Sequence, residues 1–339
     1  MIDDTSFQPD DDTRLVKPEP VANHRAAPAW TPDAGIPLAR PLGEPVDVEF
    51  ATPARRPPSP WFGVLAFLLC FVLFLVTQIG AALYLGLEAT LQWIGALTAA
   101  GEIFAMGVVP IGLVLLMRRS LVRDLHLTRP RGLLIVALLP LLIVWPVAAQ
   151  ILSQYLGQFL APDLEHAELI ERLVTWDSPT RMVIVTFQIA VVPALFEELL
   201  FRGLLLAALL RLTGVVPAIL ISSLLFAGVH VPAQIVVSPL AAIGMLIPLA
   251  FLGIGLAILT VRTGTIAYAC LLHFANNFSA LLLSNLLPAD LDPADFDLDV
   301  YIDGRVVAAL VVVAILLLVV WSWLARRPVA VARPVALDA

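Results

Sequence analysis

Long apolar runs, separated by short polar stretches, dominate the sequence after residue 58. They cover residues 61–86, 91–117, 132–153, 182–210, 215–231, 239–261, 265–287 and 306–325. A helix rises about 1.5 Å per residue and a bilayer core is about 30 Å thick, so most of these runs can cross a membrane. The run 215–231 is marginal in length, whereas 182–210 is long enough to cross and then continue along the membrane surface. The pattern predicts an all-α polytopic membrane protein with about eight transmembrane helices.

Composition agrees with this class and divides the chain. The sequence is 60% hydrophobic and only 14% charged, whereas soluble domains are about one-quarter charged. Residues 1–58 are proline-rich and hold ten acidic against six basic residues, which predicts a disordered acidic tail. We therefore expect a transmembrane domain over 59–326 and a short C-terminal tail over 327–339. The lipid bilayer is the expected surrounding, and the absence of a basic patch with interleaved aromatic residues argues against a nucleic-acid partner.

The arginines predict how the helices are oriented. They precede the first span and then gather after the second, fourth, sixth and eighth, whereas the alternate loops are acidic. Loop 154–181 holds five acidic residues against two arginines, and loop 288–305 holds six aspartates against one arginine. Because cytoplasmic loops carry the excess of Lys and Arg, both termini are predicted to be cytoplasmic, in a bacterial plasma membrane.

Two adjacent carboxylates and a guanidinium interrupt the fourth apolar run, at Glu197, Glu198 and Arg202. Each ionised residue near a bilayer centre costs about 2.5–3.5 kcal/mol, so such residues face protein and pair with one another. Glu198 and Arg202 are i,i+4 neighbours on one helix face and can pair, whereas Glu197 lies about 100° further round and is free to face another helix. Pro193, just ahead of the pair, loosens that turn or simply kinks the helix.

Further polar side chains follow in the next spans. A lone histidine such as His230 is most often a core or interfacial residue, but His273 and Asn277 are i,i+4 and share one helix face. Their bland interpretation is an interhelical hydrogen bond. Counted from Gly214 and Gly264 at 1.5 Å per residue, His230 lies about 24 Å and His273 about 13 Å along its helix. The two can therefore meet only if the helices are tilted or begin at different levels.

The order of these motifs is specific. Glu-Glu-x-x-x-Arg at 197–202, Phe-x-x-x-His at 226–230 and His-x-x-x-Asn at 273–277 together resemble the CPBP intramembrane protease family. That family includes the type II CAAX prenyl endopeptidases and bacterial bacteriocin-processing or immunity proteins. The resemblance covers residues 182–287, about a third of the chain. It implies an intramembrane endopeptidase that cuts a membrane-delivered protein or peptide.

The same resemblance implies a role for each matching residue. Glu197 would be the general base that activates water, and His230 would help to hold that water. His273 and Asn277 would stabilise the oxyanion. The supporting pair would be Glu198 and Arg202. This chemistry is reasonable in itself, because peptide hydrolysis without a nucleophilic side chain needs a base and also donors aimed at the developing negative charge.

Several alternatives remain open from the sequence. Glu197, His230 and His273 could instead hold zinc with an open position for water, although the His-Glu-x-x-His motif is absent, so glutamate-activated water is favoured and no cofactor is certain. A membrane transporter that relays protons or ions would also use buried carboxylates and histidines. A non-catalytic immunity or scaffold protein is the third reading. Glu102, the remaining acid at membrane depth, lies outside the motifs; pairing with Arg202 is open for it, and it receives no role.

Overall fold

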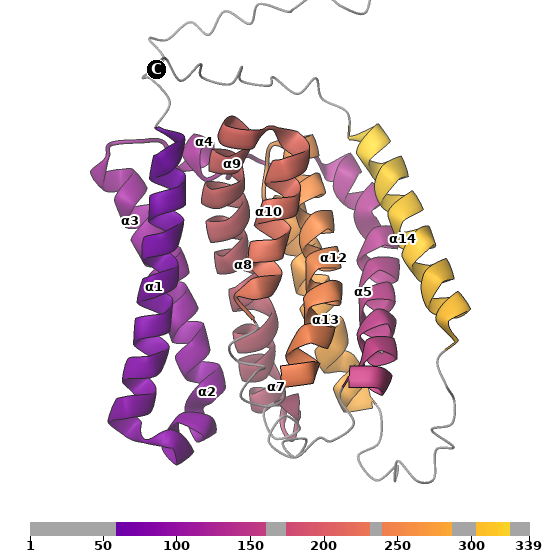
Figure 1. The fold of residues 1–339 in the computed structure, drawn as a ribbon, viewed down its shortest axis with the longest axis horizontal. Helices are drawn as coiled ribbons and strands as arrows, with labels where there is room; N and C mark the ends of the chain where they lie inside the picture. Colours follow the sequence, from indigo (N-terminus) through magenta and orange to yellow (C-terminus); the bar gives the residue numbers. More distant parts are fainter. Residues whose placement is uncertain (1–58, 161–173, 231–238, 287–302, 326–339) are drawn as a thin grey trace, which may run out of the picture. The chain divides into compact units, whose positions relative to one another are not determined.

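The computed structural model describes residues 59–160, 174–230, 239–286 and 303–325 (Figure 1). Every regular element within these ranges is a helix, which confirms the predicted all-α class. The predicted tails, 1–58 and 327–339, lie outside the described residues.

The helices follow the predicted apolar runs closely. In chain order they are α1 (Pro60–Leu85), α2 (Leu87–Gly101), η1 (Glu102–Val108), α3 (Val109–Leu116), α4 (Leu121–Asp124), α5 (Gly132–Leu160), α7 (Pro179–Thr186), η2 (Phe187–Val191), α8 (Val192–Glu198), η3 (Leu199–Leu205), α9 (Leu206–Thr213), α10 (Val215–Gly228), α12 (Pro239–Thr263), α13 (Ala267–Leu286) and α14 (Gly304–Leu324). The three η elements are π-helical segments inside longer helices.

A polytopic membrane bundle is confirmed by helix length and composition. Among the described residues, six helical runs are long and apolar enough to cross a membrane. The two other predicted spans also form helices. α10 has only 14 residues, and α13 carries a histidine and three asparagines that lower its hydropathy. For these two helices, crossing the membrane stays a prediction.

The longest run, Pro179–Thr213, is one helical rod of 35 residues. The expectation that its end turns along the membrane surface is wrong, because η3 and most of α9 are buried inside the bundle. Its contact with α1 is close: a Cβ added at Gly63 would lie 2.7 Å from the Cβ of Ala208. Small residues at such contacts let membrane helices approach closely, so the end of the rod is held in the interior.

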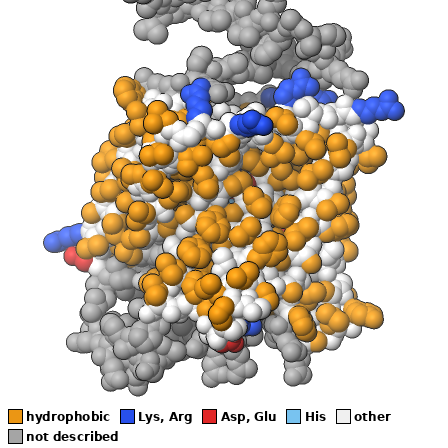
Figure 2. All heavy atoms as spheres, turned by 180° about the vertical axis from the view of Figure 1, so that it is seen from behind, with side chains coloured by type: hydrophobic (Ala, Val, Ile, Leu, Met, Phe, Trp, Pro, Cys, Tyr) orange, Lys and Arg blue, Asp and Glu red, His pale blue; other side chains and the backbone are white. Residues whose placement is uncertain are grey.

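The outer surface is apolar, and arginines gather at one edge. Figure 2 shows hydrophobic side chains across most of one face, with arginine and lysine colouring mainly along its upper border. Large exposed apolar side chains occur along α1, α5, α10 and α14, as expected for helices whose outer face meets lipid. The cytoplasmic orientation of this edge, with both termini on that side, stays a prediction.

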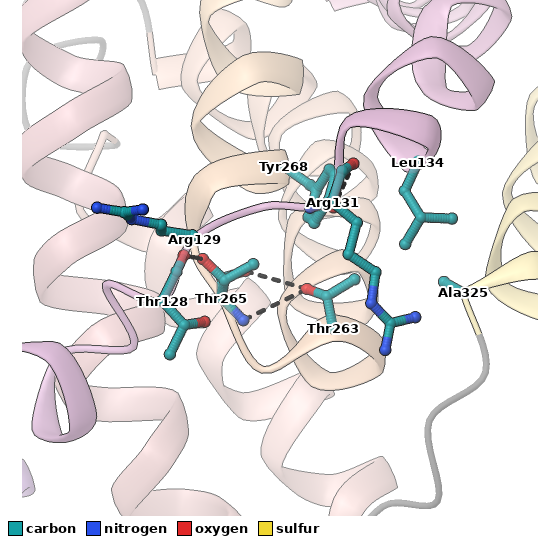
Figure 3. A pocket seen from close by; sticks show the side chains of 8 residues that line it. All are labelled: Thr128, Arg129, Arg131, Leu134, Thr263, Thr265, Tyr268 and Ala325. Atoms are coloured by element: carbon teal, nitrogen blue, oxygen red, sulfur yellow. Dashed lines mark hydrogen bonds between the residues drawn. The ribbon is translucent and has the colours of Figure 1, made fainter.

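A polar junction fixes the start of α13. The loop after α4 crosses the turn between α12 and α13, where a small pocket of about 40 Å³ lies (Figure 3). Thr265 Oγ1 donates to the Thr128 carbonyl at 2.7 Å, and the Arg131 amide donates to the Tyr268 hydroxyl at 2.6 Å. Since Tyr268 is one turn and a half before His273 on the same helix, this junction also sets the position of that histidine.

Candidate active site

Two π-helical segments flank the acid pair in the long rod. η2 ends just before Pro193, and η3 begins directly after Glu198. A π-helical segment is often found at functional sites, because it loosens the regular hydrogen-bond ladder. Pro193 has no N–H for the carbonyl four residues before it, and the side chain of Asn277 donates to that carbonyl, on Ile189, at 3.1 Å. Asn277 therefore ties α13 to the turn that leads into the acid pair.

Glu198 and Arg202 form the predicted ion pair. Arg202 Nη1 lies 3.0 Å from Glu198 Oε1, and both side chains are completely buried. Arg202 Nη2 also donates to the Gly253 carbonyl on α12 at 3.2 Å, and its guanidinium lies 4.5 Å from the ring centroid of Phe226. A buried charge pair is stable only when further hydrogen bonds satisfy it. Here α12 and α10 supply those contacts.

His273 extends this pair toward Glu197. Its Nδ1 lies 3.0 Å from Glu198 Oε1, and because an ionised carboxylate only accepts hydrogen bonds, Nδ1 carries the proton. This contact orients the ring so that Nε2 lies 3.9 Å from Glu197 Oε2. Glu198 is thus shared by a guanidinium and an imidazole, and it fixes both.

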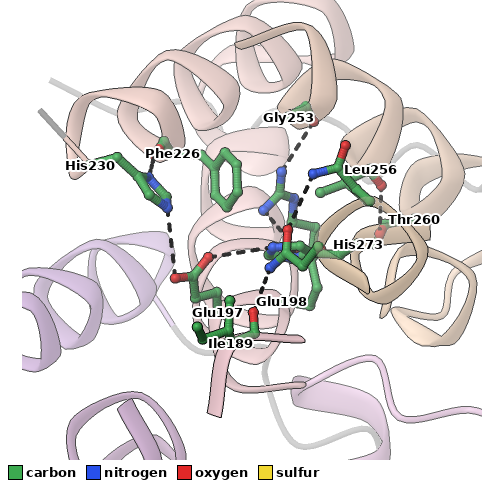
Figure 4. A network of polar contacts seen from close by, with 12 residues as sticks. Ile189, Glu197, Glu198, Phe226, His230, Gly253, Leu256, Thr260 and His273 are labelled. Carbon is green, nitrogen blue, oxygen red and sulfur yellow. Dashed lines mark hydrogen bonds and ion pairs between the residues drawn. The ribbon is translucent and has the colours of Figure 1, made fainter. Parts of the chain in front are cut away.

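His230 approaches Glu197 from the other side. Its Nδ1 lies 2.8 Å from the Phe226 carbonyl, one turn back, so Nδ1 donates there. Its Nε2 then lies 3.9 Å from Glu197 Oε1 (Figure 4). Both histidines therefore present Nε2 to Glu197, one at each carboxylate oxygen. A distance of 3.9 Å is too long for a direct hydrogen bond, which leaves the carboxylate free to accept from another group.

The side chains differ in their access to the outside. His230 is 32% exposed, whereas Glu197 is 9% and His273 is 3% exposed. The cluster is therefore reached from the His230 side, and its far side is closed by the buried ion pair. Such a partly closed setting strengthens electrostatic interactions within it.

The structure brings all six predicted site residues into one neighbourhood, but two contacts were not foreseen. Sequence reasoning placed His273 and Asn277 together as free donors, whereas His273 also contacts Glu198 and Asn277 donates to a backbone carbonyl. The two further participants that sequence reasoning missed are Phe226 and Gly253. The first carries the Phe-x-x-x-His signal, but a glycine that offers only its carbonyl has no sequence signal.

The open pairing of Glu102 with Arg202 is not present among the contacts of Arg202, which are with Glu198, Gly253 and the phenylalanine rings. The chemistry of Glu197, His230 and His273 is that of a zinc ligand set, yet within the described residues no group of three His, Cys, Asp or Glu side chains could hold a metal ion. We therefore derive no step through zinc.

The fold and this cluster define the class of protein: a helical membrane protein with a glutamate and two histidines gathered inside its bundle. Comparison with known families narrows it. Residues 179–279 match the family model described as type II CAAX prenyl endopeptidase Rce1-like, which confirms the family resemblance of that segment. The matched segment contains all six site residues, and it supports a CAAX-type intramembrane endopeptidase. No curated protein and no solved structure matched the chain.

Proposed function

We propose that the protein is an intramembrane endopeptidase in which Glu197 activates a water molecule for attack on a peptide bond of a membrane-delivered protein or peptide. One observation carries the proposal: the Glu197 carboxylate is faced at each oxygen by the Nε2 atom of a histidine at 3.9 Å, inside a bundle whose matched segment belongs to an endopeptidase family.

The first step is proton transfer from water to Glu197, as the water oxygen bonds to the substrate carbonyl carbon. A general base of this kind contributes about 10²–10⁴-fold to a rate. His230 holds the water: its Nδ1 proton is engaged with the Phe226 carbonyl, so a neutral ring offers the Nε2 lone pair to a water proton. The carbon–nitrogen bond then breaks, and the leaving nitrogen takes the proton that Glu197 received.

The carbonyl oxygen becomes negative during attack, and donors must face it. His273 donates from Nε2 only as an imidazolium, because Nδ1 already donates to Glu198. The Glu198 carboxylate stabilises that positive charge. Asn277 uses one amide hydrogen on the Ile189 carbonyl, and its second amide hydrogen supplies the other donor. Glu198 and Arg202 act through His273 and support its position.

The test compares cells that produce the wild-type protein with cells that produce Glu197→Gln. We expect membrane peptides whose cleavage depends on the wild-type protein and falls about 10²–10⁴-fold with the variant. The matched control is Asp177→Asn, the same carboxyl-to-amide change at an exposed residue, which should cleave like wild type. Wild-type proteolysis by Glu197→Gln protein of normal abundance would refute the proposal.

Two further outcomes separate the alternatives. The cleaved peptide is incubated with purified protein in liposomes, with and without a zinc chelator. Loss of cleavage that zinc restores would replace glutamate-activated water with a metal mechanism. An ion flux that depends on Glu197, without any cleavage, would replace the endopeptidase with a transporter.

A further inference from the structure

Glu102 is a buried acid that the proposed mechanism does not use. It opens η1, outside the matched segment, and is 4% exposed. Its Oε2 atom is buried and has no hydrogen-bond partner. Placing a carboxyl group at membrane depth without a partner is costly, so such a residue points to a function.

The packing of η1 brings Glu102 to the level of the candidate site. η1 packs against α8, and a Cβ added at Gly107 would lie 2.5 Å from the ring of Phe196, the residue before Glu197. Glu102 lies 14 residues before the end of α3 at Leu116, and Glu197 lies 16 residues before the end of α9 at Thr213. At 1.5 Å per residue, these depths are about 21 and 24 Å.

The charges around Glu102 leave it without a cation of its own. On the elements packed against η1, the buried titratable side chains are Cys70, Glu197, Glu198 and Arg202. Arg202, the cation in this set, is engaged with Glu198 and the Gly253 carbonyl. The group that acts electrostatically on Glu102 is Glu197, whose Oε2 also lacks a hydrogen-bond partner.

We propose that Glu102 and Glu197 form a coupled carboxyl pair that holds one proton, with Glu102 as a positioning residue that acts through the Glu197 base. Two neighbouring carboxylates in a buried site cannot both ionise without strong repulsion. The active form is then the one in which Glu102 carries the proton and Glu197 carries the charge. The proton moved during hydrolysis comes from water and leaves with the amine, so the proton on Glu102 is not consumed.

This inference rests on the proposed function for its meaning in catalysis, but the coupling can be measured without a substrate. Infrared spectra of the purified protein in liposomes are recorded across a pH series. We expect a C=O stretching band of a protonated carboxyl group that is absent in Glu102→Gln. In Glu197→Gln the repelling charge is gone, so the Glu102 band should disappear at a pH lower by about one unit or more than in wild type, the interaction that makes two groups titrate as a pair.

The control is Ser322→Ala, which removes another buried and unpartnered polar atom, on α14. Its carboxyl band should titrate as in wild type. A Glu102 band whose titration is the same in wild type and Glu197→Gln would overturn the proposal, as would a wild-type spectrum that Glu102→Gln leaves unchanged.

Once a cleaved peptide is known, activity provides the second arm. Glu102→Gln keeps a neutral side chain of the same shape, so kcat near neutral pH should stay within about threefold of wild type. The alkaline limb of its kcat profile should move up by about one pH unit or more. A purely structural role would leave the profile in place, and that result would refute the coupled pair. Failure of Glu197→Gln to abolish cleavage would instead refute the proposed function while the infrared shift stands.

Discussion

The buried ion pair makes the sharpest prediction about stability. Changing Arg202 to methionine keeps the length of the side chain but leaves Glu198 buried with only His273 as a partner. Both members of the pair are completely buried, so the cost is that of an uncompensated interior charge, about 3–5 kcal/mol. For a chain of this size, at about 2 °C per kcal/mol, the apparent unfolding midpoint should fall by roughly 6–10 °C.

The double variant tests the reasoning behind that magnitude. Adding Glu198→Gln to Arg202→Met removes both charges, and the amide oxygen still accepts from His273. The double variant should therefore lose less than about half as much stability as Arg202→Met alone. A control, Arg211→Met at the partly exposed end of the same rod, should stay within about 0.5 kcal/mol of wild type.

The assay is thermal unfolding of purified protein in one detergent at one scan rate, with wild type, both single variants, the double variant and the control in parallel. Losses that add up in the double variant would mean that the two side chains do not depend on each other. That result would refute the account of the site as a charge pair held by its surroundings.

Three other outcomes follow from described contacts. Asn277→Leu removes the donor to the carbonyl left open by Pro193, so adding Pro193→Ala, which restores an N–H, should recover part of the lost midpoint in thermal unfolding but no cleavage; recovered cleavage would contradict an oxyanion role. Gly107→Ala should cost about 1–3 kcal/mol in the same assay because its methyl group meets a phenylalanine ring, whereas Gly112→Ala, which meets nothing, should be neutral or slightly stabilising. Burial lowers the pKa of His126, so the unfolded chain binds its proton first as pH falls and stability should drop below about pH 6.5; His126→Asn, which tolerates the φ of 54° there, should flatten that drop, and an unchanged pH dependence would contradict it.

The parts of the fold that depend on local sequence could be predicted. Apolar runs locate the described helices within a few residues, except that α5 extends to Leu160 rather than ending near residue 153. The pairing of Glu198 with Arg202 also follows from spacing along one helix. That Glu197, His230 and His273 gather was predicted from the order of the motifs, and the structure agrees in placing them together.

What could not be predicted depends on how the helices are rotated and raised relative to one another. Nothing in the sequence indicates that His273 would turn Nδ1 to Glu198 or that the carbonyl of Gly253 would accept from Arg202. The unequal depths of the two histidines, about 24 and 13 Å when counted from the turns, are reconciled because the helices do not begin at one level. The turn before α13 is tied by Thr265 to the loop that crosses it, which no periodicity reveals.

The π-helical segment η2 makes the rod sensitive to the number of residues it contains. Such a segment is equivalent to one extra residue inserted into an α-helix, and its removal would restore the regular winding. Deleting a single residue from Phe187–Val191 would then rotate everything after it by about 100° relative to the start of the rod. Glu197 would turn away from one or both histidines even though no side chain of the cluster had been altered. A functional chain of this type should therefore tolerate many substitutions in η2 and no change in its length.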